Sequence, residues 1–240
     1  DLLADEEEKE AIRQAVSAIV DHIIDHGFCL VDVDGRPTTW AVWAPEKLNL
    51  EDQWGAEKGC NSLEILSFLK TAHHMTGNER YEKAYRDLIE RHHYAMNVID
   101  EKILFMGRAS HIDDQLAFQS YVPLLTYEKD PYLRSLYLMG LERHWQYERP
   151  ERNPVWNAIY GALTDRPWDG ENAVQSLAEL PLDLIHWQTQ NSARADIQLD
   201  PKLAALGRIQ AKNPLPFDER PLHKWDSNPY QLDGGNGRRA

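Results

Sequence analysis

Acidic and histidine side chains gather in one stretch of this 240-residue chain, Ser110–Tyr121. His111, Asp113 and Asp114 lead directly into a run of apolar residues with helical spacing. Acids are typical of a helix start, because they accept hydrogen bonds from its free amides and face the positive end of its dipole. They are also groups that transfer protons, since two carboxylates close together raise the pKa of one of them. The residue types alone leave both interpretations open.

Apolar residues recur at helical spacing over most of the chain, which predicts an all-α fold. Most of the expected helices are paired across short turns, so that they form αα-hairpins. The expected helices are a leading one at 5–26, then 61–76 paired with 81–92, 112–129 paired with 131–147, and 154–163 paired with 172–187.

Two regions interrupt the helical pattern. Short β-prone runs around Asp34-Gly35 predict a β-hairpin near residues 28–43, within a hairpin-and-loop insertion over 28–59. From residue 189 onward the chain is rich in Pro, Gly, Asn and charged residues, so that 189–240 is expected to be loop-rich. We interpret 1–240 as a single domain, part of a longer chain.

The hairpins are related to each other by an internal repeat. Helical repeats of this kind bury their apolar faces by stacking on their neighbours. The period suits an (α/α) toroid or partial toroid, a ring in which inner and outer helices alternate. At an offset of 52 residues the matched positions are Leu88–His93 with Gly140–Trp145, Tyr85 with Tyr137, Leu66 with Phe118, Asn61 with Asp113, and Ser62 with Asp114.

In a toroid the starts of the inner helices gather at one mouth, where polar side chains can converge on a cleft. Asp113 and Asp114 are therefore candidate acid/base residues, and His111 is a candidate for orienting groups or transferring protons. Aromatic and polar residues near the mouth or on the late loops are candidates for binding substrate, although each also suits packing or capping. These candidates are Asn61, Trp54, Trp156, Asn157, Tyr160, Arg194, Asp196, His223 and Trp225.

The ten histidines do not follow a metal-binding pattern. Adjacent residues such as His73 and His74 cannot both face one ion from a helix. His92, His144 and His186 recur at equivalent places and are interpreted as packing residues or as partners of a helix C-terminus. We therefore expect neither a metal nor another cofactor.

Charge and composition limit the partners. A formal net charge of −13 without a basic cluster argues against nucleic acid, whose binding depends on Lys and Arg. No run approaches the ~18 apolar residues of a membrane span. Cys29 and Cys60 lack the Cys-x-x-Cys spacing of zinc ribbons and thioredoxins, and whether they pair is left open.

Four segments look like parts of bacterial proteins of the six-hairpin glycosidase-like (α/α) toroid group: Ser62–Lys70, Thr76–Tyr81, His111–Phe118 and Asn191–Asp196. The resemblance covers roughly residues 55–200 and concerns architecture, since no family-defining catalytic motif is matched. It implies activity on glycans, with acids, His or Tyr near the ends of inner helices. A full ring needs six hairpins, whereas three plus a leading helix are found here.

Together these observations predict a carbohydrate-active enzyme that cleaves a glycosidic bond of an oligo- or polysaccharide by hydrolysis or elimination. Hydrolysis needs two carboxylates ~5–10 Å apart, so a second acid such as Glu64 or Asp183 is expected beside Asp113 and Asp114. The alternative is a non-catalytic glycan-binding module or helical-repeat scaffold. A periplasmic or secreted location is slightly favoured over a cytoplasmic one, and the oligomeric state is left open.

Overall fold

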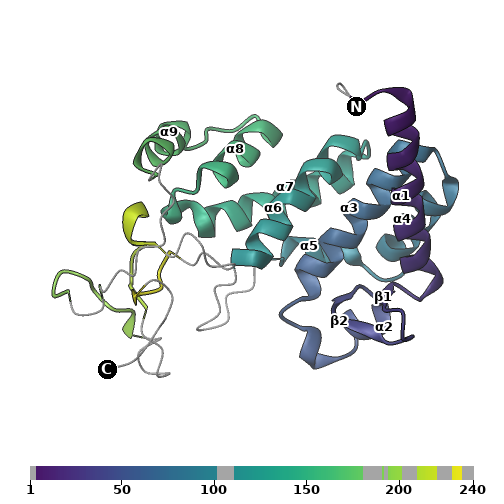
Figure 1. Cartoon of the computed structure of the whole chain (residues 1–240), viewed down its shortest axis with the longest axis horizontal. Helices are drawn as coiled ribbons and strands as arrows, with labels where there is room; N and C mark the ends of the chain where they lie inside the picture. The colour runs from purple at the N-terminus through teal and green to yellow at the C-terminus, as the bar shows by residue number, and fades with distance from the viewer. Residues whose placement is uncertain are drawn as a thin grey trace. The chain divides into compact units, whose positions relative to one another are not determined.

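The computed structural model describes residues 4–101, 111–180, 191, 194–201, 210–220 and 229–233. The described part is mostly helical with one small two-stranded antiparallel sheet, which confirms the all-α prediction (Figure 1). The chain divides into two compact units, described separately below. Unit 1 comprises residues 1–103 and 116–141, and unit 2 comprises residues 104–115 and 142–240.

Unit 1 contains the N-terminal helices and strands. They are α1 (Glu6–Asp25), β1 (Cys29–Val31), β2 (Pro37–Val42), α2 (Pro45–Leu48), the 3-10 helix η1 (Asp52–Trp54), α3 (Lys58–Thr76), α4 (Glu79–Glu90) and α5 (Tyr94–Ile99). Two long helices contribute residues to both units: α6 (His111–Tyr127) and α7 (Pro131–Glu148). Unit 2 further contains η2 (Arg149–Glu151), α8 (Pro154–Leu163), α9 (Gly170–Glu179) and η3 (Phe217–Glu219).

Helix α3 is the core helix of unit 1. It packs against α1, α4 and α5, and its Leu63, Leu66 and Leu69 are completely buried. A helix that is apolar on most sides needs such neighbours, because its side chains cannot all face one partner. Helix α3 ends at Gly77, which has a left-handed backbone (φ 68°) that glycine adopts at little cost. Asn78 then caps α4, because its side chain accepts a hydrogen bond from the Arg80 amide.

The predicted β-hairpin is present as β1 and β2, with Cys29 opposite Val42. The Asn61 side chain fastens it to α3, because Nδ2 donates to the Val42 carbonyl oxygen at 2.8 Å. Asn61 was predicted at a helix start, and this is wrong, since α3 begins at Lys58. The expected loop up to residue 59 is also wrong in part, because α2 and η1 lie within it.

Each predicted pair of helices is present, with small shifts at the ends. Helices α3 and α4 pack together, as do α8 and α9. Helix α9 begins at Gly170, two residues earlier than expected, and the expected continuation over 181–187 lies outside the described residues. Helix α5 was not predicted, because six residues are too few to show a period. The toroid and the single domain stay predictions.

The described parts of the late chain contain loops and one short 3-10 helix, as the composition indicates. Ala211, Leu215 and Leu232 form a small apolar cluster, against which Ile197 packs. Cys29 and Cys60 are not joined by a disulfide bond, which answers the pairing question. Among the described helices, none combines the length and the apolar character that a membrane span requires.

Candidate functional site

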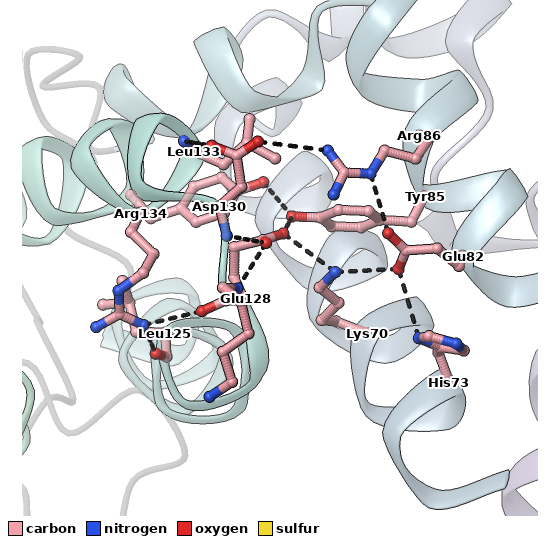
Figure 2. Close-up of polar contacts among 12 residues, drawn as sticks. Lys70, His73, Glu82, Tyr85, Arg86, Leu125, Glu128, Asp130, Leu133 and Arg134 are labelled. Atoms are coloured by element: carbon pink, nitrogen blue, oxygen red, sulfur yellow. Dashed lines mark hydrogen bonds and ion pairs between the residues drawn. The ribbon is translucent and has the colours of Figure 1, made fainter. Parts of the chain in front are cut away.

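A buried polar network in unit 1 joins α3 and α4 to the turn between α6 and α7 (Figure 2). The Tyr85 hydroxyl donates to Glu128 Oε2 at 2.5 Å and lies 2.7 Å from the Tyr137 hydroxyl. Lys70 Nζ lies 3.2 Å from Glu128 Oε2 and 3.0 Å from Glu82 Oε2. Its charge also lies 4.3 Å above the centre of the Tyr85 ring. The Glu128 carboxylate thus interacts with two donor side chains of the first hairpin, Tyr85 and Lys70.

The protonation states in this network follow from its contacts. Burial opposes ionisation of Glu128, but the Tyr85 hydroxyl, the Asp130 amide and the Lys70 charge outweigh it and lower the pKa of Glu128. Burial, with smaller contributions from Tyr137 and Glu128, raises the pKa of Tyr85. Glu128 is 1 % exposed, and both of its oxygens are engaged, one by Tyr85 and Lys70 and the other by the amides of Lys129 and Asp130. The network anchors helices to one another, and we do not assign chemistry to it.

A second polar group lies in unit 2, where α6 supplies Asp114 and α7 supplies His144 and Glu148. His144 Nε2 lies 2.9 Å from Asp114 Oδ1. One potential ligand atom from each of the three residues lies within 4.8 Å of the other two. Their exposed fractions are 1 % for Asp114, 0 % for His144 and 6 % for Glu148.

The two helices position this group by simple geometry. Asp114 lies in the first turn of α6, where a carboxylate is favoured by the helix dipole. His144 and Glu148 are four residues apart on α7, a spacing that places two side chains on the same helix face. Adjacent helix positions diverge by about 100°, so Asp113 cannot share the direction of Asp114. Asp113 is half-buried, whereas Asp114 is buried against His144.

The structure gives Asp113 and Asp114, two of the three predicted catalytic residues, different surroundings. Asp114 belongs to the buried group and Asp113 lies beside it along the helix. His111 begins α6, and its side chain lies outside the described residues. The predicted second acid Glu64 accepts a hydrogen bond from Trp43 Nε1 in unit 1, and Asp183 lies outside the described residues.

The candidates on α8 are packing residues in this structure. Trp156 is 5 % exposed. Asn157 Oδ1 accepts from Trp145 Nε1 at 2.8 Å. The Tyr160 ring stacks on that of Trp145 with centroids 3.9 Å apart. These contacts join α7 to α8, and a role of Trp156, Asn157 or Tyr160 in binding substrate stays a prediction.

The remaining candidates are dispersed. Trp54 is half-buried in η1, and Asn61 holds the β-hairpin as described above. Arg194 and Asp196 are exposed and paired, with Arg194 Nε 3.0 Å from Asp196 Oδ1, and Arg194 also pairs with Glu219. His223 and Trp225 lie outside the described residues.

Sequence reasoning missed His144 and Glu148 as site residues. His144 was interpreted as a packing residue because it matches His92 in the repeat. Its buried position fits that interpretation, but its bond to Asp114 was not expected. The missed signal is a comparison across the repeat: with the offset of 52, the positions of Asp114, His144 and Glu148 correspond to Ser62, His92 and Met96. Both carboxylates are therefore specific to the second hairpin.

The arrangement has the composition of an acid/base group. A carboxylate bonded to an imidazole orients the ring and stabilises its protonated form, and a second carboxylate can exchange a proton nearby. One imidazole with two carboxylates is also a set of potential metal ligands. A scan of family models finds no match for this chain, and searches of curated proteins and of solved structures likewise find none.

Proposed function

We propose that this chain belongs to a carbohydrate-active enzyme that cleaves a glycosidic bond of an oligo- or polysaccharide. Asp114, His144 and Glu148 act as its acid/base group, and the αα-hairpins form part of an (α/α) toroid. The observation that carries the proposal is the bond between His144 Nε2 and Asp114 Oδ1, with Glu148 beside it. This pair lies at the first turn of α6, where the sequence predicts the mouth, and its position supports the proposal.

The spacing of the carboxylates supports some reactions over others. An inverting hydrolase holds its two carboxyl groups ~6.5–9.5 Å apart to leave room for water, whereas a retaining one holds them ~5–5.5 Å apart. One carboxylate oxygen of Asp114 lies within 4.8 Å of one of Glu148. This close approach suits the retaining spacing, and an elimination sets no such requirement.

In the elimination, His144 removes a proton from the carbon next to a uronate carboxyl group, and Asp114 stabilises the imidazolium that forms. The electron pair of that C–H bond forms a C=C bond, and the glycosidic C–O bond breaks. Protonated Glu148 gives its proton to the leaving oxygen. Each step is ordinary general acid/base catalysis, which contributes about 10²–10⁴-fold to a rate.

The burial of Asp114, His144 and Glu148 limits the access of substrate. Because His144 is 0 % exposed, the proposal requires a movement that admits substrate to the imidazole. Enzymes commonly close over their substrates in this way, so that water is excluded during the reaction.

A panel of polysaccharides, including uronate-containing ones, tests the proposal with the full chain. Asp114→Asn keeps the size of the side chain but removes its charge, and we expect activity to fall about a hundredfold or more. Asp113→Asn tests the neighbouring acid. Asp165→Asn is the matched control, because this aspartate is exposed in the turn before α9.

Product analysis distinguishes the reactions, since elimination yields an unsaturated uronide and hydrolysis does not. If the wild-type chain cleaves a glycan and both Asp113→Asn and Asp114→Asn retain full activity, the assignment is wrong. Loss of activity in Asp165→Asn would show that the effect is not specific to α6.

A helical-repeat scaffold is the second candidate, and the closed burial of the three side chains favours it. Buried polar groups can fix which helix faces meet without taking part in a reaction. In that case Asp114→Asn lowers the free energy of unfolding, and the wild-type chain cleaves nothing on the panel.

A further inference from the structure

We propose that Asp114, His144 and Glu148 bind one divalent transition-metal ion, such as Zn²⁺ or Mn²⁺. The inference concerns the group used in the proposed function, but it stands on the geometry of that group and not on glycan cleavage. It departs from the sequence prediction of no metal, which interpreted His144 as a packing residue or a partner of a helix C-terminus.

The distances suit a shared ion. Zinc lies about 2.0–2.2 Å from an imidazole nitrogen or a carboxylate oxygen, which places two ligands of one tetrahedral ion ~3.3 Å apart. His144 Nε2 and Asp114 Oδ1 are 2.9 Å apart, close to that value. The ion takes the place of the proton between them, and the imidazole then carries its proton on Nδ1. One oxygen of Glu148 lies within 4.8 Å of one ring nitrogen of His144 and of one carboxylate oxygen of Asp114, and it becomes the third ligand after a side-chain rotation.

The charges of the surroundings also favour a cation. Asp114 and Glu148 place two carboxylates beside one imidazole, at exposed fractions of 6 % or less. Burying like charges together is costly unless an opposite charge or hydrogen bonds compensate. A divalent ion neutralises both carboxylates.

The ligand types indicate which ion binds. Imidazole suits zinc, copper, iron or nickel, and the two carboxylates also suit manganese, whereas calcium and magnesium prefer oxygen ligands alone. Three protein ligands leave a position for water, as in catalytic zinc sites, where the pKa of the bound water falls to about 7. Such a water would act as the base in place of the imidazole.

The repeat supplies a matched internal comparison. At the offset of 52 residues His92 corresponds to His144, although His92 lies in the turn after α4, and Ser62 and Met96 stand at the positions of the two acids. If histidine alone attracted an ion, the two positions would behave alike. The proposal predicts that they differ.

Metal binding is measured on the metal-free 240-residue chain by titration with Co²⁺ alone, followed by visible absorption, with Zn²⁺ as competitor. We expect one ion per chain. Asp114→Asn and Glu148→Gln keep all ten histidines, and we expect each to weaken Co²⁺ binding about tenfold or more. His92→Gln removes a histidine outside the group and is expected to bind as the wild type does.

Unchanged binding in both Asp114→Asn and Glu148→Gln would overturn the proposal, as would absence of binding in the wild type. Circular dichroism checks that the variants fold. A second measurement does not depend on them: Zn²⁺ raises the Tm of the wild type and of His92→Gln, and Mg²⁺ at the same concentration does not. If Zn²⁺ does not raise the Tm of the wild type, the proposal of a metal site is also overturned. Metal binding without glycan cleavage would contradict the proposed function only, and cleavage without metal binding would contradict this inference only.

Discussion

The hydroxyl oxygens of Tyr85 and Tyr137 lie 2.7 Å apart, although 52 residues separate them in the sequence. These two tyrosines are the ones that the internal repeat matches, one on α4 and the other on α7. Helices α4 and α7, each the second helix of its hairpin, thus carry a tyrosine at the same repeat position, and the two hydroxyls lie close together. Glu128 and Lys70 complete the contact. A polar network therefore connects the two copies of the repeat (Figure 2).

Tyr85→Phe removes the hydroxyl that bonds to both Glu128 and Tyr137. Because Glu128 stays buried with one donor fewer, we expect the free energy of unfolding to fall by about 1–3 kcal/mol. Urea unfolding measures the change. Tyr132→Phe is the control, since the Tyr132 side chain is largely exposed, and a loss of equal size there would contradict the role of the network.

The lowered pKa of Glu128 predicts acid sensitivity. The ordinary pKa of a glutamate is 4.5, and the folded state holds that of Glu128 below it. Ionised Glu128 therefore stabilises the fold above pH ~4.5, and this contribution is lost as the pH falls through the folded pKa. We expect Glu128→Gln to be less stable near pH 7 and to lose less stability on acidification.

Chemical unfolding of wild type and Glu128→Gln at several pH values measures this effect. The difference between the two proteins should shrink as the pH is lowered. A difference that is constant or grows on acidification would show that Glu128 does not stabilise the fold as a carboxylate.

Gly140→Ala has two opposing effects on stability, a gain in helix propensity and a loss in packing. Alanine favours a helix interior over glycine by up to about 1 kcal/mol. A Cβ at Gly140, however, would lie 2.5 Å from the Val98 carbonyl oxygen and 2.7 Å from the Tyr121 hydroxyl. We expect the clash to dominate, with a net loss of about 1–3 kcal/mol in the free energy of unfolding. Met139→Ala, at the exposed neighbouring position, is the control, and stabilisation by Gly140→Ala would contradict the close contact.

The local structure was largely predictable because it depends on local patterns. The helix pairs follow from apolar spacing, and Asn153 caps α8 by accepting from the Val155 and Trp156 amides. The β-hairpin follows from β-prone runs around Asp34-Gly35. Helices α2 and α5 and the 3-10 helix η1 were missed because short elements depend on their contacts more than on their own pattern.

The site was less predictable, because it depends on which helix faces meet. The sequence places Asp113 and Asp114 together at a helix start, but only packing decides that Asp114 turns toward His144. Glu148 joins them from a position 34 residues further along the chain, which periodicity in α6 alone cannot reveal. The difference between the two repeat copies is the sequence signal that does point to it.

A comparison of the two repeat-equivalent histidines tests the central claim most directly. His144→Gln and His92→Gln are assayed on the same polysaccharide panel as the wild type, with circular dichroism to confirm folding. The account predicts that His92→Gln keeps the wild-type activity and that His144→Gln, although folded, loses about a hundredfold or more. Equal activities in the two folded variants would contradict it.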